Sequence, residues 1–337
     1  MQTAIITGER QGGIENQPDP RIRAPFVKIK IHAAPMCTEV QAYRDGGVTD
    51  RLGHEAAGEV VEADGPSKVA VGDRVVVMPQ FACGKCRLCL DGDYIHCDHP
   101  LDPLACCHSE TGIATYAQYC IKQDWLLLPI PADLSYDHAS MACCGLGPTF
   151  SAVRRMQVSA ADTVLVSGLG AVGLGGVINA VALGARVLAI ESHPYRAELG
   201  KTLGAEAVID PKDPHKLQQI LDLTGGRGAD KSIETSSAEN APAFLLEATR
   251  ARGHVASVGW GGPMLARRVV AKGLTVHGVW HWNHLRDAEA MIATLRKSRA
   301  ALDRFITHTF PLARVQDAWE LQLTGQCGKI VLHPWDH

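Results

Sequence analysis

The sequence predicts an α/β protein with two domains, one rich in β-strands and one built on a doubly wound parallel sheet. The chain has 337 residues, more than a single hydrophobic core usually supports. Its first part alternates apolar and charged residues over short segments, as half-buried strands do. After Ala160, apolar strands alternate with helices, which is typical of a parallel sheet covered by helices.

Composition excludes several classes of protein. Hydrophobic residues make up 46% of the chain and charged residues 20%, as in globular proteins. A net charge of -3 gives no basic footprint for nucleic acid or an anionic membrane. No run approaches the roughly 18 apolar residues of a membrane span, and residues 1–9 lack the features of a signal peptide. Eleven cysteines, an odd number, favour thiolates in a reducing compartment, so we expect the cytoplasm.

Strands and turns are expected through the first part of the chain. Residues 26–31 alternate apolar and charged side chains, and Cys37 follows this segment on a loop. A helix after Thr149 is predicted to connect the two domains. Three further segments have strand character: 71–77, 112–119 and 125–129.

Four cysteines are clustered with the spacing C-x2-C-x2-C-x7-C: Cys83, Cys86, Cys89 and Cys97. Four thiolates in one short lobe can close a tetrahedron around zinc with no vacancy, which makes a structural site. An iron–sulfur cluster is the alternative, because it also takes four cysteines. Residues 106–108, Cys-Cys-His, are interpreted as bystanders because four ligands are already present.

A second set of metal ligands is spread over the first part of the chain. It consists of Cys37, His54 with the adjacent Glu55, and the pair Cys143–Cys144. Two thiolates and an imidazole form the three-ligand set of a catalytic zinc that keeps one position open for water or substrate.

A glycine-rich turn opens the predicted parallel sheet. The strand 162–167 is followed by Gly168-Leu169-Gly170-Ala171-Val172-Gly173, then by a small-residue helix and the strand 186–190, which ends at Glu191. Strand, turn, helix and terminal acid together predict dinucleotide binding, with the pyrophosphate on the helix N-terminus. Glu191 can accept hydrogen bonds from both ribose hydroxyls and would repel a 2′-phosphate, so NAD is favoured over NADP. His193 and Arg196 lie close enough to weaken that preference.

The same alternation continues to the C-terminus. Lys329, at the start of a tail strand over 329–332, is a candidate to contact a cofactor phosphate. Further strands are predicted at 207–210, 231–234, 254–259 and 275–280, and helices at 216–223, 242–249 and 287–297.

With these motifs in one chain, the sequence resembles the zinc-dependent medium-chain dehydrogenases, the family of alcohol, sorbitol and threonine dehydrogenases. The resemblance covers essentially the whole length. It implies a GroES-like catalytic domain in two pieces, 1–147 and 282–337, around a Rossmann NAD-binding domain at 148–281.

The resemblance also implies roles for the metal ligands. Cys37, His54 and Cys144 match the catalytic zinc ligands, and Glu55 matches a carboxylate that can approach the same zinc. Cys144 is preferred over Cys143 because the residues that follow it match the family's stretch after this ligand. The four-cysteine lobe matches the structural zinc site.

One departure from the family pattern concerns the proton relay. A Ser or Thr followed by Asp usually stands two residues after the first ligand, whereas this chain has Cys37-Thr38-Glu39-Val40-Gln41. Either Glu39 takes the hydroxyl's place, or one residue is deleted and Thr38 supplies the hydroxyl. The deletion fits better, because Thr38-Glu39-Val40-Gln41 then matches the usual Thr-Asp-Val-His.

The expected function is hydride transfer between NAD(H) and a secondary alcohol or ketone, with a polyol, cyclitol or sugar-like compound as substrate. A primary alcohol or aldehyde enzyme, or a non-catalytic redox sensor that binds NAD and zinc, is the alternative; a zinc-ribbon nucleic-acid module is disfavoured by the acidic balance. The expected partners are a small-molecule substrate and further copies of the chain, as a homodimer or homotetramer.

Overall fold

The computed structural model describes residues 1–336 and divides them into two compact units. The first unit holds Met1–Cys144, Asn283–Arg296 and the chain from Ile306 onward; the second holds Gly145–Trp282 and Lys297–Phe305. His337, the last residue of the predicted segment 282–337, lies outside the described residues. Within the described chain no helix is long and apolar enough to cross a membrane.

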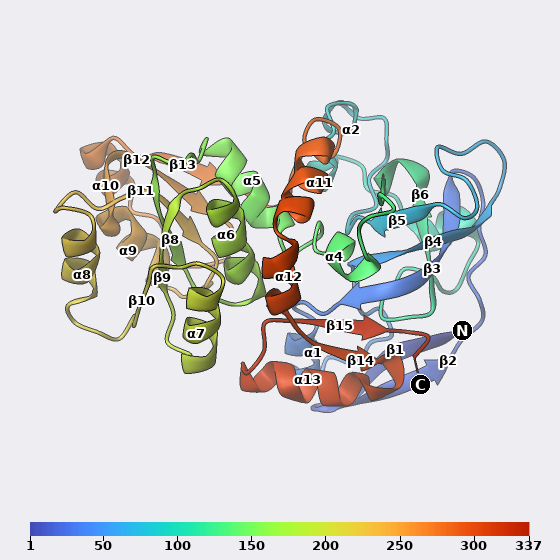
Figure 1. The fold of residues 1–337 in the computed structure, drawn as a ribbon. Coiled ribbons are helices and arrows are strands. Elements are labelled where there is room, and N and C mark those ends of the chain that lie inside the picture. Colours follow the sequence, from blue (N-terminus) through green and yellow to red (C-terminus); the bar gives the residue numbers. More distant parts are fainter. Residues whose placement is uncertain (337) are drawn as a thin grey trace. The chain divides into compact units, whose positions relative to one another are not determined.

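A seven-stranded sheet forms the frame of the first unit (Figure 1). Its strands, in spatial order, are β14 (Ile306–Pro311), β15 (Lys329–His333), β3 (Phe26–Pro35), β4 (Ala56–Ala63), β5 (Arg74–Val77) and β7 (Leu127–Pro129), with β6 (Tyr119–Gln123) also paired to β3. The predicted alternation is observed in β3, where Ile29 and Ile31 are buried and Lys28 and Lys30 are partly exposed. A separate antiparallel pair is formed by β1 (Gln2–Gly8) and β2 (Gln11–Asn16).

The helices of the first unit are short. They are α1 (Val40–Asp45), α2 (Arg87–Leu90), α3 (Pro103–Cys107), α4 (Tyr136–Ser140), α11 (Ala288–Lys297) and α13 (Val315–Thr324), with 3-10 turns η1 (Tyr94–His96), η2 (Asp124–Leu126) and η3 (Leu312–Arg314). The core contains Tyr43 and Trp319, whose rings stack with centroids 4.8 Å apart. This stacking joins α1 to α13, although the two helices are far apart in sequence.

The strand predicted at 112–119 does not form. Gly112 has a φ of +110°, and the backbone N–H groups of Thr115 and Tyr116 donate to the carbonyl of Leu52 instead of to a neighbouring strand. Regular pairing therefore begins only at Tyr119, the first residue of β6.

The second unit is a six-stranded, wholly parallel sheet. Its spatial order is β10 (Ala207–Ile209), β9 (Arg186–Ile190), β8 (Thr163–Ser167), β11 (Ala229–Glu234), β12 (Thr249–Ser257) and β13 (Thr275–Gly278). The strand order reverses between β8 and β11, and in open sheets of this type ligands bind at that point. Val164–Val166 are fully buried because both faces of the sheet are covered.

Helices cover both faces of this sheet (Figure 1). In the figure α6 and α7 stand on one side and α8, α9 and α10 on the other. The helices of the second unit are α5 (Gly147–Arg155), α6 (Ala171–Ala182), α7 (Pro194–Thr202), α8 (Lys216–Leu223), α9 (Ala241–Ala248), α10 (Ala266–Lys272) and α12 (Arg299–Phe305). This alternation of strand and helix is the predicted Rossmann arrangement.

One segment groups differently from the prediction. Residues 297–305 were assigned to the first domain, but they pack with the second unit. The ammonium of Lys297 donates to the carbonyl of Ala182 at the end of α6, and Arg304 donates to the carbonyl of Thr202 at the end of α7. Both bonds place basic side chains on helix C-termini, where the free carbonyls accept them.

Two glycines in the turn after β8 have different packing. A Cβ at Gly173 would lie 1.8 Å from the carbonyl oxygen of Gly168, whereas a Cβ at Gly170 meets nothing within 4 Å. Gly173 therefore permits close packing between α6 and the turn, and Gly170 faces open space.

We expect Gly173→Ala to lower the free energy of unfolding of the second unit by about 1–3 kcal/mol, because the turn or α6 must shift to admit the methyl group. Gly170→Ala is the matched control and should cost less than about 1 kcal/mol, since this glycine only caps the helix. Calorimetric melting of the two variants measures the difference. Equal losses of unfolding free energy in the two variants would show that close packing at Gly173 does not stabilise the second unit.

Candidate metal and dinucleotide sites

The four clustered cysteines converge in the structure. The sulfurs of Cys83, Cys86, Cys89 and Cys97 all lie within 4.8 Å of one another. The S···S distances are 3.4 Å between Cys86 and Cys89, 3.9 Å between Cys83 and Cys89, and 4.0 Å between Cys86 and Cys97. A tetrahedron with Zn–S bonds of ~2.3 Å places its sulfurs about 3.8 Å apart, so the set has the size of a closed zinc site.

The backbone of this lobe favours thiolates. The N–H groups of Cys83 and His99 point at the sulfur of Cys97, at 3.2 and 3.4 Å. Backbone N–H groups of Cys89 and Asp98 lower the pKa of the Cys86 thiol to about 6. All eleven cysteines of the chain are free thiols, so none of these four is used in a disulfide.

A second cluster brings together Cys37, His54, Glu55 and Cys144, whose ligand atoms also lie within 4.8 Å of one another. Strand pairing explains how the first three meet. Cys37 follows β3, and His54 and Glu55 precede β4; because these strands are antiparallel neighbours, the end of one and the start of the other share one edge of the sheet.

Cys144 completes this cluster from the segment after α4. Its sulfur lies 3.2 Å from Nε2 of His54, and its backbone N–H donates to Oε2 of Glu55 at 3.0 Å. The neighbouring Cys143 is fully buried and its thiol donates to the carbonyl of Val77 at 3.3 Å, so it points away from the cluster.

The electrostatics of the cluster favour a cation. The hydrogen bond with Cys144 lowers the pKa of the Cys37 thiol well below its usual range. Burial lowers the pKa of His54, but hydrogen bonds with Cys37 and Glu39 outweigh it and raise that pKa to about 11. A strongly raised imidazole pKa marks an excess of negative charge, and this charge together with two sulfurs and an imidazole suits zinc.

Glu55 forms a buried ion pair with Lys329. The two side chains are 0% and 1% exposed, and Nζ of Lys329 lies 2.9 Å from Oε1 of Glu55. Burial raises the pKa of Glu55 to about 7 although the charge of Lys329 opposes the shift. Lys329, predicted as a phosphate contact, is thus committed to a carboxylate beside the cluster, and we correct that assignment.

The two residues that follow Cys37 have side chains in different surroundings. Thr38 is exposed. Glu39, in contrast, points at the cluster, with Oε1 2.6 Å from Nδ1 of His54. Glu39 therefore reaches a candidate metal ligand, and the choice between the two alignments of this run stays a prediction.

Two side chains that the sequence did not indicate hold the backbone of Cys37. The hydroxyl of Tyr116 accepts from the Cys37 N–H at 3.0 Å, and Nε2 of Gln322 donates to the Cys37 carbonyl at 2.7 Å. Neither residue belongs to a motif, and they are 79 and 285 positions from Cys37. Only the fold brings them to the first ligand.

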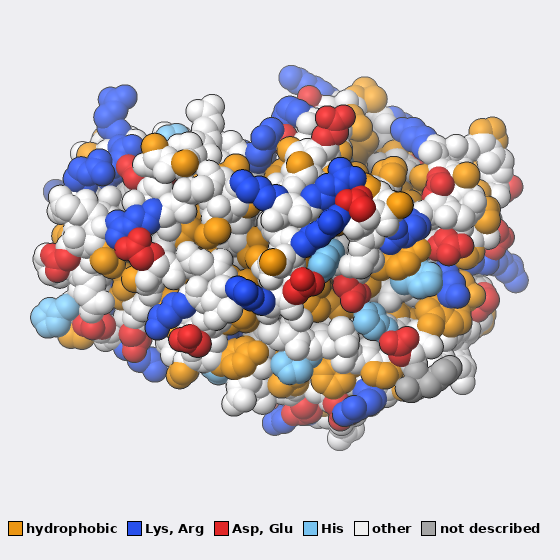
Figure 2. All heavy atoms as spheres, in the orientation of Figure 1, with side chains coloured by type: hydrophobic (Ala, Val, Ile, Leu, Met, Phe, Trp, Pro, Cys, Tyr) orange, Lys and Arg blue, Asp and Glu red, His pale blue; other side chains and the backbone are white. Residues whose placement is uncertain are grey.

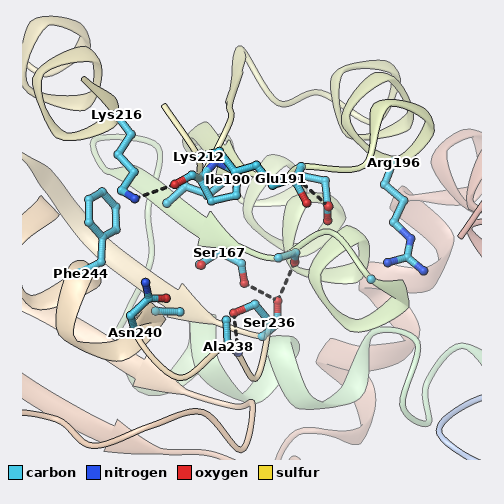
Figure 3. A pocket seen from close by; sticks show the side chains of 16 residues that line it. Ser167, Ile190, Glu191, Arg196, Lys212, Lys216, Ser236, Ala238, Asn240 and Phe244 are labelled. Atoms are coloured by element: carbon cyan, nitrogen blue, oxygen red, sulfur yellow. Dashed lines mark hydrogen bonds between the residues drawn. The ribbon is translucent and has the colours of Figure 1, made fainter. Parts of the chain in front are cut away.

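The second unit has a cavity of about 510 Å³ where its strand order reverses (Figure 3). Predicted residues that line it are Gly168, Gly170, Glu191 and Arg196. Gly168 has a φ of +86°, and a Cβ there would lie 2.6 Å from Ser236, so only glycine fits the turn. The open space at the Cβ position of Gly170 lets a ligand approach the backbone closely.

Glu191 is fixed at the end of β9 by three backbone donors. Its Oε1 accepts from the N–H groups of Ser192 and His193 at 2.8 Å, and its Oε2 accepts from Leu169 at 2.7 Å. A carboxylate has about four acceptor positions, so capacity remains for a hydroxyl in the cavity. Arg196 also faces the cavity, and its buried Nε has no hydrogen-bond partner among the described residues.

The opposite end of the cavity was missed from the sequence. Figure 3 shows Lys216 and Phe244 across the cavity from Arg196. Nζ of Lys216 donates to the carbonyl of Pro211 at 2.6 Å and lies 5.2 Å from the Phe244 ring centroid. Ala171 and Val172 begin α6, whose free N–H groups lie next to Gly170.

Comparison with known proteins connects these sites to a family. Residues 24–132 match the model of the alcohol dehydrogenase GroES-like domain, and residues 171–297 match that of the zinc-binding dehydrogenase. L-threonine 3-dehydrogenase of Bacillus licheniformis is 31% identical, with 97% of this chain and 96% of that protein covered. Sorbitol dehydrogenase of Bacillus subtilis is 29% identical, with 99% and 97% covered.

A solved structure supports the same conclusion. Alcohol dehydrogenase TADH from Thermus sp. ATN1 superposes with a TM-score of 0.86 at 25% identity, with 99% of both chains covered. The predicted GroES-like and Rossmann fold is therefore confirmed. With both domain models matched in order and full-length relatives above 30% identity, the chain belongs to the zinc-dependent medium-chain dehydrogenase family.

Proposed function

We propose that this protein transfers hydride between NAD(H) and a secondary alcohol or ketone, in an enzyme with one catalytic and one structural zinc. The observation that carries the proposal is the second donor cluster. A Cys-His-Cys set with a buried carboxylate at its side is the arrangement of an open, reactive zinc, and the closed four-cysteine lobe accounts separately for a structural ion.

In this proposal Cys37, His54 and Cys144 hold the catalytic zinc, with Glu55 able to approach it. A zinc ion bound there supplies Lewis-acid chemistry that lowers the pKa of an alcohol hydroxyl. Glu39 accepts from Nδ1–H of His54, which fixes the ring with Nε2 on the side of the Cys144 sulfur, where it could bind the ion. Thr38 stays the proposed first proton carrier, and its exposure lets the hydroxyl exchange protons with water.

Lys329 and Glu55 keep the third ligand in place. The carboxylate of Glu55 accepts from the Cys144 N–H with one oxygen and from Lys329 with the other. Because both oxygens are engaged, the carboxylate is oriented before any metal or substrate arrives.

The second unit supplies the cofactor site. Glu191 would accept from the adenosine ribose hydroxyls of NAD, and the N-terminus of α6 at Ala171 and Val172 would bind the pyrophosphate. Arg196 adds a positive charge to the same cavity. The space at Gly170 admits the pyrophosphate against the backbone.

The names of the two relatives support a secondary alcohol as the substrate. Sorbitol is a polyol, and a 3-dehydrogenase of L-threonine acts on a secondary carbon. A small molecule therefore fits the site better than a polymer. On the face in Figure 2, basic and acidic side chains are interspersed, with no continuous basic surface for nucleic acid on that face. Eleven cysteines, none of them in a disulfide, support a cytoplasmic location.

We also propose a homo-oligomer that associates through β13. This strand ends the parallel sheet, and an unpaired edge invites pairing with a second copy. Large apolar side chains beside it are exposed, with Trp260 at 81%, Val270 at 80% and Trp280 at 50%. The rings of Trp260 and Trp280 meet edge to face at 5.8 Å. Trp282, in contrast, is buried against Phe150.

The metal assignment predicts about two zinc ions per chain in protein purified without added metal, and about one in Cys144→Ser. Cys143→Ser is the matched control; it should keep about two, because Cys143 points away from the cluster. Elemental analysis gives the zinc and iron content together. About one zinc in both the native protein and Cys144→Ser would leave only the four-cysteine site and refute the catalytic zinc.

The substrate assignment predicts NADH formation with sorbitol, other polyols or L-threonine, and much lower kcat/KM with short primary alcohols. Absorbance at 340 nm measures the NADH that is formed. The cofactor is tested in the same assay: NADP in place of NAD should lower kcat/KM at least about tenfold, because Glu191 repels the 2′-phosphate. Faster oxidation of primary alcohols would favour the alternative enzyme. NAD binding without any turnover in a protein with two zincs would favour a redox sensor.

The interface predicts that Val276→Lys shifts the native protein toward monomer, because the two copies would bring like charges together at β13. Val48→Lys is the control, an exposed valine of the first unit. Sedimentation velocity gives the masses. An unchanged oligomer in Val276→Lys would place the interface elsewhere.

A further inference from the structure

Tyr116 stands out among the groups near the second cluster because its side chain is fully buried and carries a polar hydroxyl. Its position is fixed from several directions. The Tyr116 backbone N–H donates to Leu52, its carbonyl accepts from the N–H of Ala4, and its ring lies over Gly53, where a Cβ would be 2.4 Å from Cδ1. The hydroxyl therefore projects from a rigid support.

That hydroxyl has two partners, both of which touch the cluster. It accepts from the backbone N–H of Cys37 at 3.0 Å and donates to Oε2 of Glu39 at 2.9 Å. The other oxygen of Glu39 accepts from Nδ1 of His54 at 2.6 Å. One hydroxyl thus connects the backbone of the first proposed ligand with the carboxylate that holds the second.

We propose that Tyr116 is a positioning residue for the catalytic metal, which sets Cys37 and, through Glu39, the ring of His54 in their mutual orientation. The inference rests on the proposed metal site and adds to it a residue outside every motif. Tyr116 acts through its two partners, Cys37 and Glu39.

Packing alone does not account for the hydroxyl. A phenylalanine would fill the same core volume, and a buried hydroxyl without partners costs free energy. Both hydrogen bonds of the Tyr116 hydroxyl go to the loop after β3, to Cys37 and Glu39.

The test compares Tyr116→Phe with Tyr43→Phe, which removes a second buried hydroxyl of the same core. The Tyr43 hydroxyl bonds to Arg10 and Glu320 and has no contact with the cluster. Zinc affinity is measured on the purified holoprotein by competition with a chelator, and the zinc of the four-cysteine lobe is the internal standard. The cobalt-substituted protein gives a visible spectrum that reports ligand geometry.

We expect Tyr116→Phe to bind the catalytic zinc about tenfold more weakly and to show an altered cobalt spectrum, with a melting temperature close to that of Tyr43→Phe. Native zinc affinity and spectrum in Tyr116→Phe would overturn the inference while leaving the proposed function intact. If the native protein binds only the zinc of the four-cysteine lobe, the proposed function and the inference about Tyr116 are both refuted.

A second variant tests the route through Glu39. Glu39→Asp shortens the side chain by one methylene, so a single carboxylate no longer spans Tyr116 and His54. If Tyr116 acts through Glu39, Tyr116→Phe should weaken zinc binding much less in the Glu39→Asp background than in the native one. If the losses of zinc affinity in the two single variants add up in the double variant, Tyr116 does not position His54.

Discussion

The buried ion pair between Glu55 and Lys329 is the constraint on which the first unit's site depends. Two charges removed from water are tolerated only when they meet each other and further hydrogen bonds, and here the carboxylate also accepts from the Cys144 backbone. Through the pair, the start of β4, the start of β15 and the loop that holds Cys144, the third proposed ligand, are joined by direct contacts. Loss of either partner would leave an isolated charge in the core and cost about 3–5 kcal/mol.

Around that point the proposed metal ligands are organised in successive layers. Sulfur and imidazole atoms form the inner layer, and carboxylates from Glu39 and Glu55 orient them. A third layer, the hydroxyl of Tyr116 and the amide of Gln322, holds the backbone of Cys37. Each layer lowers the conformational freedom of the one inside it, which is how a protein prepares a metal site before the metal arrives.

Local patterns made much of the molecule predictable. The four cysteines lie within fifteen residues, and the glycine turn joins one strand to one helix, so spacing alone defined the lobe and the dinucleotide turn. Contacts between distant segments were not predictable. The partner of Lys329 depends on how β15 enters the sheet, the direction of Glu39 depends on the register of β3 with β4, and the place of Lys297 depends on where α6 ends. Apolar periodicity carries no information about such pairings.

The compactness of the four-cysteine lobe has a consequence for biosynthesis. All its ligands have left the ribosome once Cys97 has emerged, and their bonds to metal need no later part of the chain. The second cluster also needs Cys144, and its supporting ion pair needs Lys329, which lies 274 positions after Glu55. The lobe could therefore close around a metal before the rest of the chain has folded, whereas the second cluster can form only after β15 has joined the sheet.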